Sequence, residues 1–215
     1  MSRSALALVS VALVGSSVPF FTAGCGTTRT AVAPERPAGR TCHGPVDIHG
    51  QADLGILTGC ESIDGDLRIT GTTLSSLSGL ERIRSVGYLV ISDNPSLTSI
   101  EGLSGLKSAA GVTINANPRL ASLSGLEQVR SLDGLVITGN GVTSLAGLDN
   151  LIVTGDLVVV GNPHLASLSG APRLTAVENL DVEKNPRLTG VGEIASVNVG
   201  GTYFTRFDDV KVSVR

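Results

Sequence analysis

A motif of about 23 residues repeats along most of this 215-residue chain, and it constrains the fold more than any other feature. One copy reads LVISDNPSLTSIEGL and the next reads VTINANPRLASLSGL. The copies start at Leu67 (a degenerate one), Leu89, Val112, Leu135, Leu157 and Leu180. Their asparagines, with spacings of 23, 23, 22 and 23, are Asn94, Asn117, Asn140, Asn162 and Asn185. A nearly fixed period predicts a repeat architecture with one coil per copy.

Each part of the motif has a local structural reason. The Leu-x-Ile triplet alternates apolar and variable residues, which predicts a strand. The Pro that follows the Asn ends the strand, and an inward-facing Asn can bond the turn backbone and stack on its copies. A serine column suits a tight bend, where a hydroxyl satisfies a buried amide: Ser76, Ser99, Ser122, Ser144 and Ser167. A glycine column suits a turn: Gly79, Gly102, Gly125, Gly147 and Gly170.

A single coil of this length cannot bury its own apolar face, so stacked coils must share one aliphatic core. The composition agrees, since only 3% of the residues are aromatic and none is Trp. We therefore predict a mainly β solenoid over residues 65–215, with six to seven coils. Residues 42–64 form its predicted N-terminal cap, and the C-terminal cap contains Tyr203, Phe204 and Phe207.

The opening segment CHGPVDIHGQADLGILTGC, from Cys42 to Cys60, is followed by IDGDLRI and resembles the start of a receptor L-domain. The repeats that follow resemble both L-domains and leucine-rich repeats, and the resemblance covers about residues 42–207. It implies a right-handed parallel β-solenoid that binds another molecule, usually a protein. The family has no catalytic motif to carry over.

Residues 1–24 have the pattern of a secretion signal. Arg3 precedes a run of small and apolar residues from Ala5 to Val14. The ending TAGC resembles the lipobox of bacterial lipoproteins, in which the sulfur of the Cys, here Cys25, carries lipid and the peptide is cut just before it. Thr22 departs from that pattern, where Leu is usual. The alternatives are ordinary secretion and a retained membrane helix, although a span needs roughly 20 apolar residues.

The lipobox implies a bacterial cell-envelope lipoprotein that is anchored in a membrane through Cys25. Gly26 is not the Asp that retains enterobacterial lipoproteins in the inner membrane, so the resemblance favours the outer membrane. Without lipidation, the expected location is secreted or periplasmic.

Three cysteines are an awkward number for a secreted chain. If Cys25 carries lipid, Cys42 and Cys60 remain as a pair, and an oxidising compartment favours a disulfide between them. Two reduced buried cysteines are the alternative. A metal site is disfavoured, because His43 and His49 are not at zinc-finger spacing to a second cysteine pair.

Residues 25–41 are rich in Pro, Gly and Thr and lack an apolar period, which predicts a flexible tether. The chain has 16 Lys and Arg against 19 Asp and Glu, a formal net charge of −3. This balance gives no general attraction to nucleic acid, and no electrostatic reason for the domain to lie on an anionic membrane.

The outward positions of the predicted strands form a candidate binding face for a protein or a glycan. Its middle is small and weakly apolar, and the residues singled out are Tyr88, Val90, Thr113, Val136 and Val158. Tyr88 is the best single anchor, because aromatic residues dominate binding energy at interfaces. The alternative is an ordinary β surface, on which valines are simply good strand formers.

An enzyme is the alternative of a different class, since some parallel β-helices cleave acidic polysaccharides. The charged set available to such a site is Asp156, Asp181, Glu183 and Lys184. Charges of this kind are also usual on a solvated face, and His43, His49 and His164 are isolated from one another in the predicted stack. We therefore expect no catalytic site, no metal and no cofactor.

Overall fold

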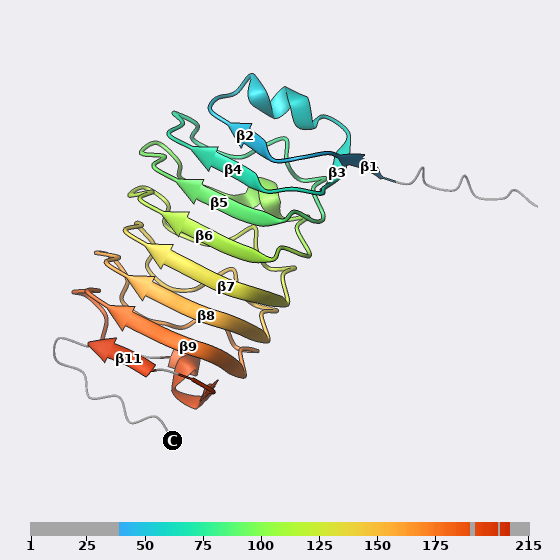
Figure 1. Cartoon of the computed structure of the whole chain (residues 1–215). Coiled ribbons are helices and arrows are strands. Elements are labelled where there is room, and N and C mark those ends of the chain that lie inside the picture. Colours follow the sequence, from blue (N-terminus) through green and yellow to red (C-terminus); the bar gives the residue numbers. More distant parts are fainter. Residues whose placement is uncertain (1–38, 190–191, 202, 207–215) are drawn as a thin grey trace, which may run out of the picture. The chain divides into compact units, whose positions relative to one another are not determined.

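The computed structural model describes residues 39–189, 192–201 and 203–206 (Figure 1). The predicted signal segment 1–24, Cys25 and the tether up to residue 38 lie outside the described residues, as does Phe207. Tyr203 and Phe204 are described by their backbone alone. The described residues belong to one compact unit.

This unit is a parallel β-solenoid of about seven turns, which confirms the predicted fold class. Its main sheet has nine strands, all paired in parallel. In chain order they are β2 (Val46–Ile48), β4 (Leu67–Thr70), β5 (Tyr88–Ser92), β6 (Gly111–Asn115), β7 (Ser131–Thr138), β8 (Val153–Val160), β9 (Ala176–Glu183), β10 (Asn198–Val199) and β11 (Tyr203–Arg206). Each of these strands pairs with the next one, except that β10 and β11 both pair with β9.

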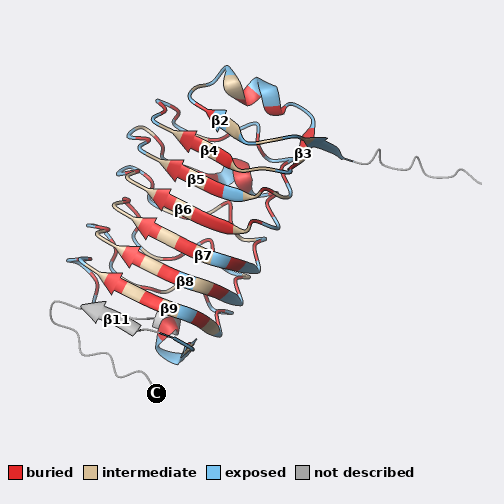
Figure 2. Cartoon of the chain, in the orientation of Figure 1, coloured by how far each residue is buried: buried red, intermediate tan, exposed pale blue. Residues whose placement is uncertain are grey.

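The register of the sheet follows the sequence repeat. One inward row contains Leu67, Leu89, Val112, Leu135, Leu157 and Leu180. A second contains Ile69, Ile91, Ile114, Ile137, Val159 and Val182. Buried and half-buried residues alternate over the last four residues of every strand from β4 to β9 (Figure 2). The alternation arises because successive side chains of a strand point to opposite faces.

The rest of each coil runs through turns in which every third residue is buried. In the first coil these residues are Leu74, Leu77, Leu80, Ile83 and Val86. The Leu80 and Ile83 N–H groups donate to the carbonyl oxygens three residues earlier, at 3.3 and 2.9 Å. This is the 3₁₀ pattern, and it continues as a short helix, η2 (Glu101–Leu103), in the second coil. The three-residue spacing of the sequence therefore reflects 3₁₀-type turns around the aliphatic core.

The N-terminal segment adds a strand to the main sheet as well as covering its end. β1 (Arg40–Cys42) pairs with β3 (Cys60–Ile63), and a short 3₁₀ helix, η1 (Asp53–Leu57), lies between β2 and β3 in the chain. β2 pairs in register with β4. The sheet therefore begins at Val46, within the segment that was predicted to be a cap alone.

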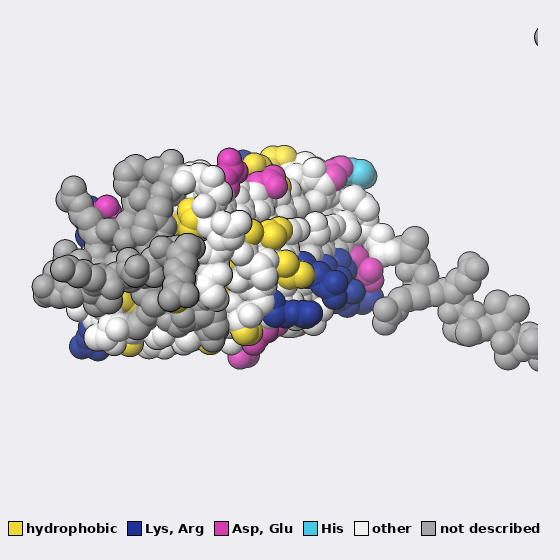
Figure 3. All heavy atoms as spheres, turned by 90° about the horizontal axis from the view of Figure 1, so that it is seen from below, with side chains coloured by type: hydrophobic (Ala, Val, Ile, Leu, Met, Phe, Trp, Pro, Cys, Tyr) yellow, Lys and Arg dark blue, Asp and Glu magenta, His cyan; other side chains and the backbone are white. Residues whose placement is uncertain are grey.

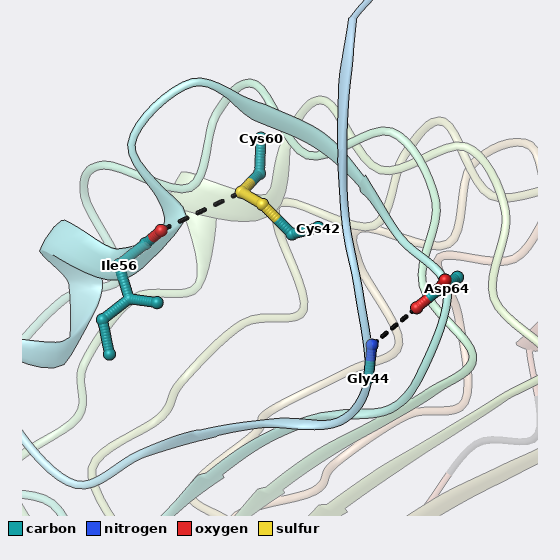
Figure 4. The surroundings of a disulfide bond; sticks show 5 residues. All are labelled: Cys42, Gly44, Ile56, Cys60 and Asp64. Carbon is teal, nitrogen blue, oxygen red and sulfur yellow. Dashed lines mark hydrogen bonds between the residues drawn. A yellow bond between two sulfur atoms is a disulfide. The ribbon is translucent and has the colours of Figure 1, made fainter.

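The predicted disulfide between Cys42 and Cys60 is confirmed, with the two Cα atoms 5.8 Å apart (Figure 4). It links the first strand of the described chain to β3. The Ile56 carbonyl oxygen lies 4.0 Å from Cys60 Sγ, a simple contact because a disulfide sulfur has no hydrogen to donate. Beside it, the Gly44 N–H donates to Asp64 Oδ1 at 2.6 Å and holds the two segments together.

At the C-terminal end, η3 (Gly192–Ser196) leads into β10, and β11 completes the described chain. Tyr203 lies opposite Leu180, and Phe204 lies opposite Asp181. The backbone of this end therefore extends the sheet beyond β9 with two short strands, both paired in parallel with β9.

Candidate functional site

The candidate binding face is the outward side of the main sheet, and its middle row runs straight across six strands. The row consists of Arg68, Val90, Thr113, Val136, Val158 and Asp181, each directly opposite the next. All six are half-buried. Neighbouring strands lie about 4.8 Å apart, so the four central residues form a flat, weakly apolar strip about 14 Å long.

Tyr88 is a large aromatic side chain exposed on this face, with 52% of its surface accessible. Its backbone N–H donates to Asp66 Oδ1 at 3.0 Å. A Cβ atom placed on Gly111, which is opposite Tyr88 on β6, would lie 2.9 Å from Tyr88 Cε1. The ring therefore lies against the bare backbone of Gly111, which buries that glycine. A side chain at position 111 would push the ring away.

Beyond the ring the face stays open. On β7, Gly134 lies opposite Gly111, in the same row of the sheet as Tyr88, and a Cβ atom there would meet nothing closer than 3.9 Å. The row continues with Asp156 and Asn179, whose side chains are joined by a 2.6 Å hydrogen bond from Asn179 Nδ2 to Asp156 Oδ1. The two glycines therefore lie between an aromatic ring on one side and a polar pair on the other, with Gly111 buried and Gly134 half-buried.

Charged side chains on β2 and β4 lie at the N-terminal end of the face. Arg68 Nη2 lies 2.6 Å from Asp66 Oδ2, and Arg68 Nη1 lies 3.7 Å from Asp47 Oδ1. Asp47 is on β2, directly opposite Arg68. One arginine between two carboxylates leaves this end with a negative balance.

The carboxylates at the C-terminal end are spread over two strands. Asp156 is on β8 and is bonded to Asn179, while Asp181 and Glu183 are two residues apart on β9. Asp181 lies opposite Val158, so no two of these carboxylates face each other across the strands. Lys184 is exposed and has a positive φ of 54° at the turn after β9.

Asp181 has an unusual environment among the described residues. Its Oδ1 atom is buried and has no hydrogen-bond partner there. Burial raises the pKa of its carboxyl group, and the nearby charge of Glu183 raises it further, while Lys184 acts in the opposite direction. The group therefore holds a proton more readily than an ordinary aspartate.

The histidines take separate positions. His43 Nδ1 lies 2.5 Å from Asp64 Oδ2, and this hydrogen bond lowers the pKa of Asp64, with a smaller contribution from the Gly44 N–H. His164 Nδ1 lies 3.4 Å from Arg187 Nη1, on a later coil. In the part of the chain that the structure describes, no group of three His, Cys, Asp or Glu residues is arranged to hold a metal ion.

The asparagine column forms a ladder of hydrogen bonds inside the solenoid. Asn94, Asn117, Asn140 and Asn162 are fully buried, and Asn185 is nearly so. Each Nδ2 donates to the strand carbonyl of the coil before it, at 2.7–3.0 Å. Each Oδ1 accepts the backbone N–H of the residue at the same position one coil earlier, at 2.9–3.2 Å. In this way the ladder satisfies turn groups that would otherwise be buried without partners.

Thr72 occupies the asparagine position of the first coil, and its role was not predicted from the sequence. Its backbone N–H donates to Asn94 Oδ1 at 2.9 Å, and its hydroxyl accepts the Leu74 N–H at 3.3 Å. Threonine can therefore end the ladder, because it has no amide Nδ2 group that would have to donate to a carbonyl oxygen of a preceding coil. The sequence contained an indication of this role, because the spacing from Thr72 to Asn94 equals the spacing from Asn140 to Asn162.

In the serine column, the hydroxyl oxygens accept hydrogen bonds at the bends of the coils. Ser99, Ser122, Ser144 and Ser167 each accept the N–H two residues later, at 3.1–3.3 Å, while Ser76 instead bonds the hydroxyl of Ser78. All five serines are half-buried.

A second column that was not predicted from the sequence lies at the corner where the strands begin. Arg84, Lys107 and Arg130 are each one repeat apart and are all exposed. The Lys107 N–H donates to the Arg84 carbonyl oxygen at 2.8 Å, and the Ile152 N–H donates to that of Arg130 at 2.8 Å. The offset that pairs Gly111 with Gly134 also places Lys107 beside Arg130. We call Arg84, Lys107, Arg130 and Ile152 the corner column.

In comparisons with models of protein families, with curated proteins and with solved structures, nothing matches this chain. Among the described residues, no helix combines the length and apolar character needed to cross a membrane.

Proposed function

We propose that this protein is a non-enzymatic cell-envelope lipoprotein whose solenoid binds a protein or a glycan on the outward face of its sheet. The observation that carries the proposal is the exposed ring of Tyr88, held against Gly111 next to a flat row of small residues. Aromatic side chains beside flat, well-ordered surfaces are typical anchors of binding interfaces.

The rigidity of the face supports this function. Each strand from β5 to β8 is paired on both sides, so a partner would not have to order a loop on binding. Such preorganisation reduces the entropic cost of association. The half-buried Val90, Thr113, Val136 and Val158 offer apolar contact area without a deep pocket.

We expect Tyr88→Ala to weaken binding of the native partner by about 30-fold or more, since truncated aromatic hot spots cost about 2 kcal/mol or more. Val136→Asp places a charge in the middle of the row and is expected to have a similar effect. Crosslinking and pull-down from the native envelope, followed by affinity measurement with the recovered partner, provides the test.

Ile56→Ala is the matched control, because Ile56 is 62% exposed but lies on η1, away from this face. The proposal fails if binding survives both face variants, or if Ile56→Ala weakens it equally. Turnover of an acidic polysaccharide that Asp181→Asn abolishes would contradict the non-enzymatic assignment, and would favour the partly buried Asp181 as a reacting group.

We further propose that lipid on Cys25 anchors the chain in the envelope, with the outer membrane as the favoured site. The support is the TAGC sequence after an apolar run. A second support is that Cys42 and Cys60 form a disulfide, which leaves Cys25 as the remaining cysteine.

Cys25→Ser is expected to move the protein from the membrane fraction to the soluble fraction, because a thioether to lipid can no longer form. Fractionation of expressing cells, with mass spectrometry of the intact chain for the lipid, tests this. A Cys25→Ser protein that stays membrane-bound would exclude the anchor. The disulfide should form equally in both proteins, which serves as the folding control.

A further inference from the structure

The corner column carries a straight line of three cations on consecutive coils. Arg84, Lys107 and Arg130 lie about 4.8 Å apart from coil to coil, so they span about 10 Å. Figure 3 shows Lys and Arg side chains gathered on the side of the molecule where the strands begin, with hydrophobic side chains beside them. Exposed Arg40 adds to the positive charge near its first member.

Among the described residues, none of the three cations takes part in an ion pair. The ion pairs of residues 39–189 involve His43, Arg68 and Arg82, and none includes a member of the corner column. Glu61, whose backbone carbonyl accepts the Arg84 N–H, directs its carboxylate to Arg82 at 3.6 Å. Glu127 is turned to the Gly125 N–H, at 2.9 and 3.0 Å. The negative net charge of the chain therefore conceals a local positive edge.

The column continues into exposed apolar residues. Ile152 follows Arg130 in the backbone ladder and is 37% exposed, and Val153 beside it is 42% exposed. These are two of the four large hydrophobic residues exposed within the described chain. A line of cations that leads into aliphatic side chains suits the interface of an anionic bilayer, where headgroups attract the charges and acyl chains accept the apolar groups. A soluble polyanion would leave Ile152 and Val153 without a contact.

The chain also enters the domain at this corner. Arg40 pairs with Cys60, Thr41 with Ser62, Ser62 with Ser85, and Ser85 with Ser108. β1 therefore heads the same ladder that carries Arg84 and Lys107. Any anchor on the preceding residues is joined to the domain directly beside the cations.

We infer that the corner column is a membrane-contacting edge, which lays the solenoid against anionic lipid headgroups and inserts Ile152 and Val153 at the interface. This inference rests on the proposed lipid anchor for its cellular setting. In this orientation the edge at the start of the strands faces the membrane, while Val90, Thr113, Val136 and Val158 lie further along their strands and stay available to a partner.

The size of the effect follows from the charges. Each Lys or Arg near an anionic surface strengthens attachment by about fivefold, so three of them give on the order of 100-fold. The Debye length is about 10 Å at 0.1 M salt and about 3 Å at 1 M, so the contact should weaken strongly in concentrated salt. For a domain that is already tethered to the membrane, the 100-fold strengthening determines the fraction of time that the edge spends on the lipid surface.

The absence of Trp from the chain allows a direct test. Ile152→Trp introduces a single fluorophore at the edge, which we call the edge reporter, and Ile56→Trp introduces one on η1, the control reporter. The full-length lipidated protein is reconstituted into vesicles of phosphatidylcholine, alone or mixed equally with phosphatidylglycerol, and quenching by brominated lipid is measured. We expect the edge reporter to be quenched in the anionic vesicles and far less in the neutral ones or in 1 M salt. The control reporter should stay unquenched in all of them.

Charge removal completes the test. Arg84→Gln, Lys107→Gln and Arg130→Gln together should lower the ratio of surface-bound to free orientations by on the order of 100-fold. The matched control removes three exposed cations after the opposite ends of the strands, with Arg119→Gln, Lys184→Gln and Arg187→Gln, and should leave quenching unchanged. Equal quenching of the edge reporter in neutral and anionic vesicles, or equal loss in both triple variants, would overturn the inference.

The anchor and the edge fail in distinguishable ways. If the anchor is wrong, the protein does not remain with neutral vesicles at all. The edge is then tested by quenching of the edge reporter in an excess of anionic vesicles, where absence of quenching overturns it. If only the edge is wrong, the protein remains with both kinds of vesicle and the edge reporter stays unquenched in both.

Discussion

Asn117→Ala is expected to lower the free energy of unfolding by about 2–6 kcal/mol, because two buried polar groups, the Ile91 carbonyl oxygen and the Asn94 N–H, lose this side chain as a partner at about 1–3 kcal/mol each. Asn117 Nδ2 donates to the Ile91 carbonyl oxygen at 3.0 Å and to Asn140 Oδ1 at 3.0 Å. Its Oδ1 accepts the Asn94 N–H at 3.2 Å. The site is fully buried, so water does not replace these bonds without opening the coil.

Thr72→Ala is the matched control for this prediction. It removes only the hydroxyl that accepts the Leu74 N–H, and the bond from its own backbone N–H to Asn94 remains. We expect a loss of about 1 kcal/mol, the usual net value of one hydrogen bond. Denaturant unfolding followed by circular dichroism compares the two. If Asn117→Ala costs no more than Thr72→Ala, the ladder does not carry the stability assigned to it.

The asparagine ladder also shows why so much of this fold is predictable from sequence. Neighbouring coils make nearly identical contacts, so the requirement at one coil reappears one repeat later and can be read as a column. Non-repeating parts lack this advantage. The strand β2 is only three residues long and is followed by η1 rather than by a standard coil, so its place in the main sheet was missed.

The candidate sites depend on contacts between coils, which a list of residues does not contain. Tyr88 was placed correctly on the outward face from the strand period, but the position of its ring against Gly111 depends on a neighbour one repeat away. The corner column was missed for a different reason. Net charge sums over the chain, whereas an electrostatic edge depends on which charges share a register and which acids are already paired.

The tight stacking of coils at the glycine column leads to the second large effect, for Gly147→Ala. Gly147 has a φ of 108°, and a Cβ atom there would overlap the Leu123 carbonyl group and the Ser124 nitrogen, which belong to the backbone of the coil before it. That backbone cannot move away freely, since the Leu123 N–H donates to the Ala146 carbonyl oxygen at 3.0 Å. We expect a loss of about 2–6 kcal/mol, the sum of about 1–3 for the backbone conformation and about 1–3 for overpacking.

Gly79→Ala separates these two contributions. Gly79 occupies the same column in the first coil and has nearly the same φ, 109°, but a Cβ atom there would meet nothing within 4 Å. It should therefore cost only the conformational part, about 1–3 kcal/mol. The difference between the two variants, measured by denaturant unfolding, isolates the cost of forcing two coils apart. Equal losses would mean that the column selects glycine for its φ alone, whereas a larger loss at Gly147 would mean that the spacing between coils selects it as well. The second outcome is expected, because Gly102 lacks a positive φ and is still glycine, and a Cβ atom there would overlap the Leu77 carbonyl group of the coil before it.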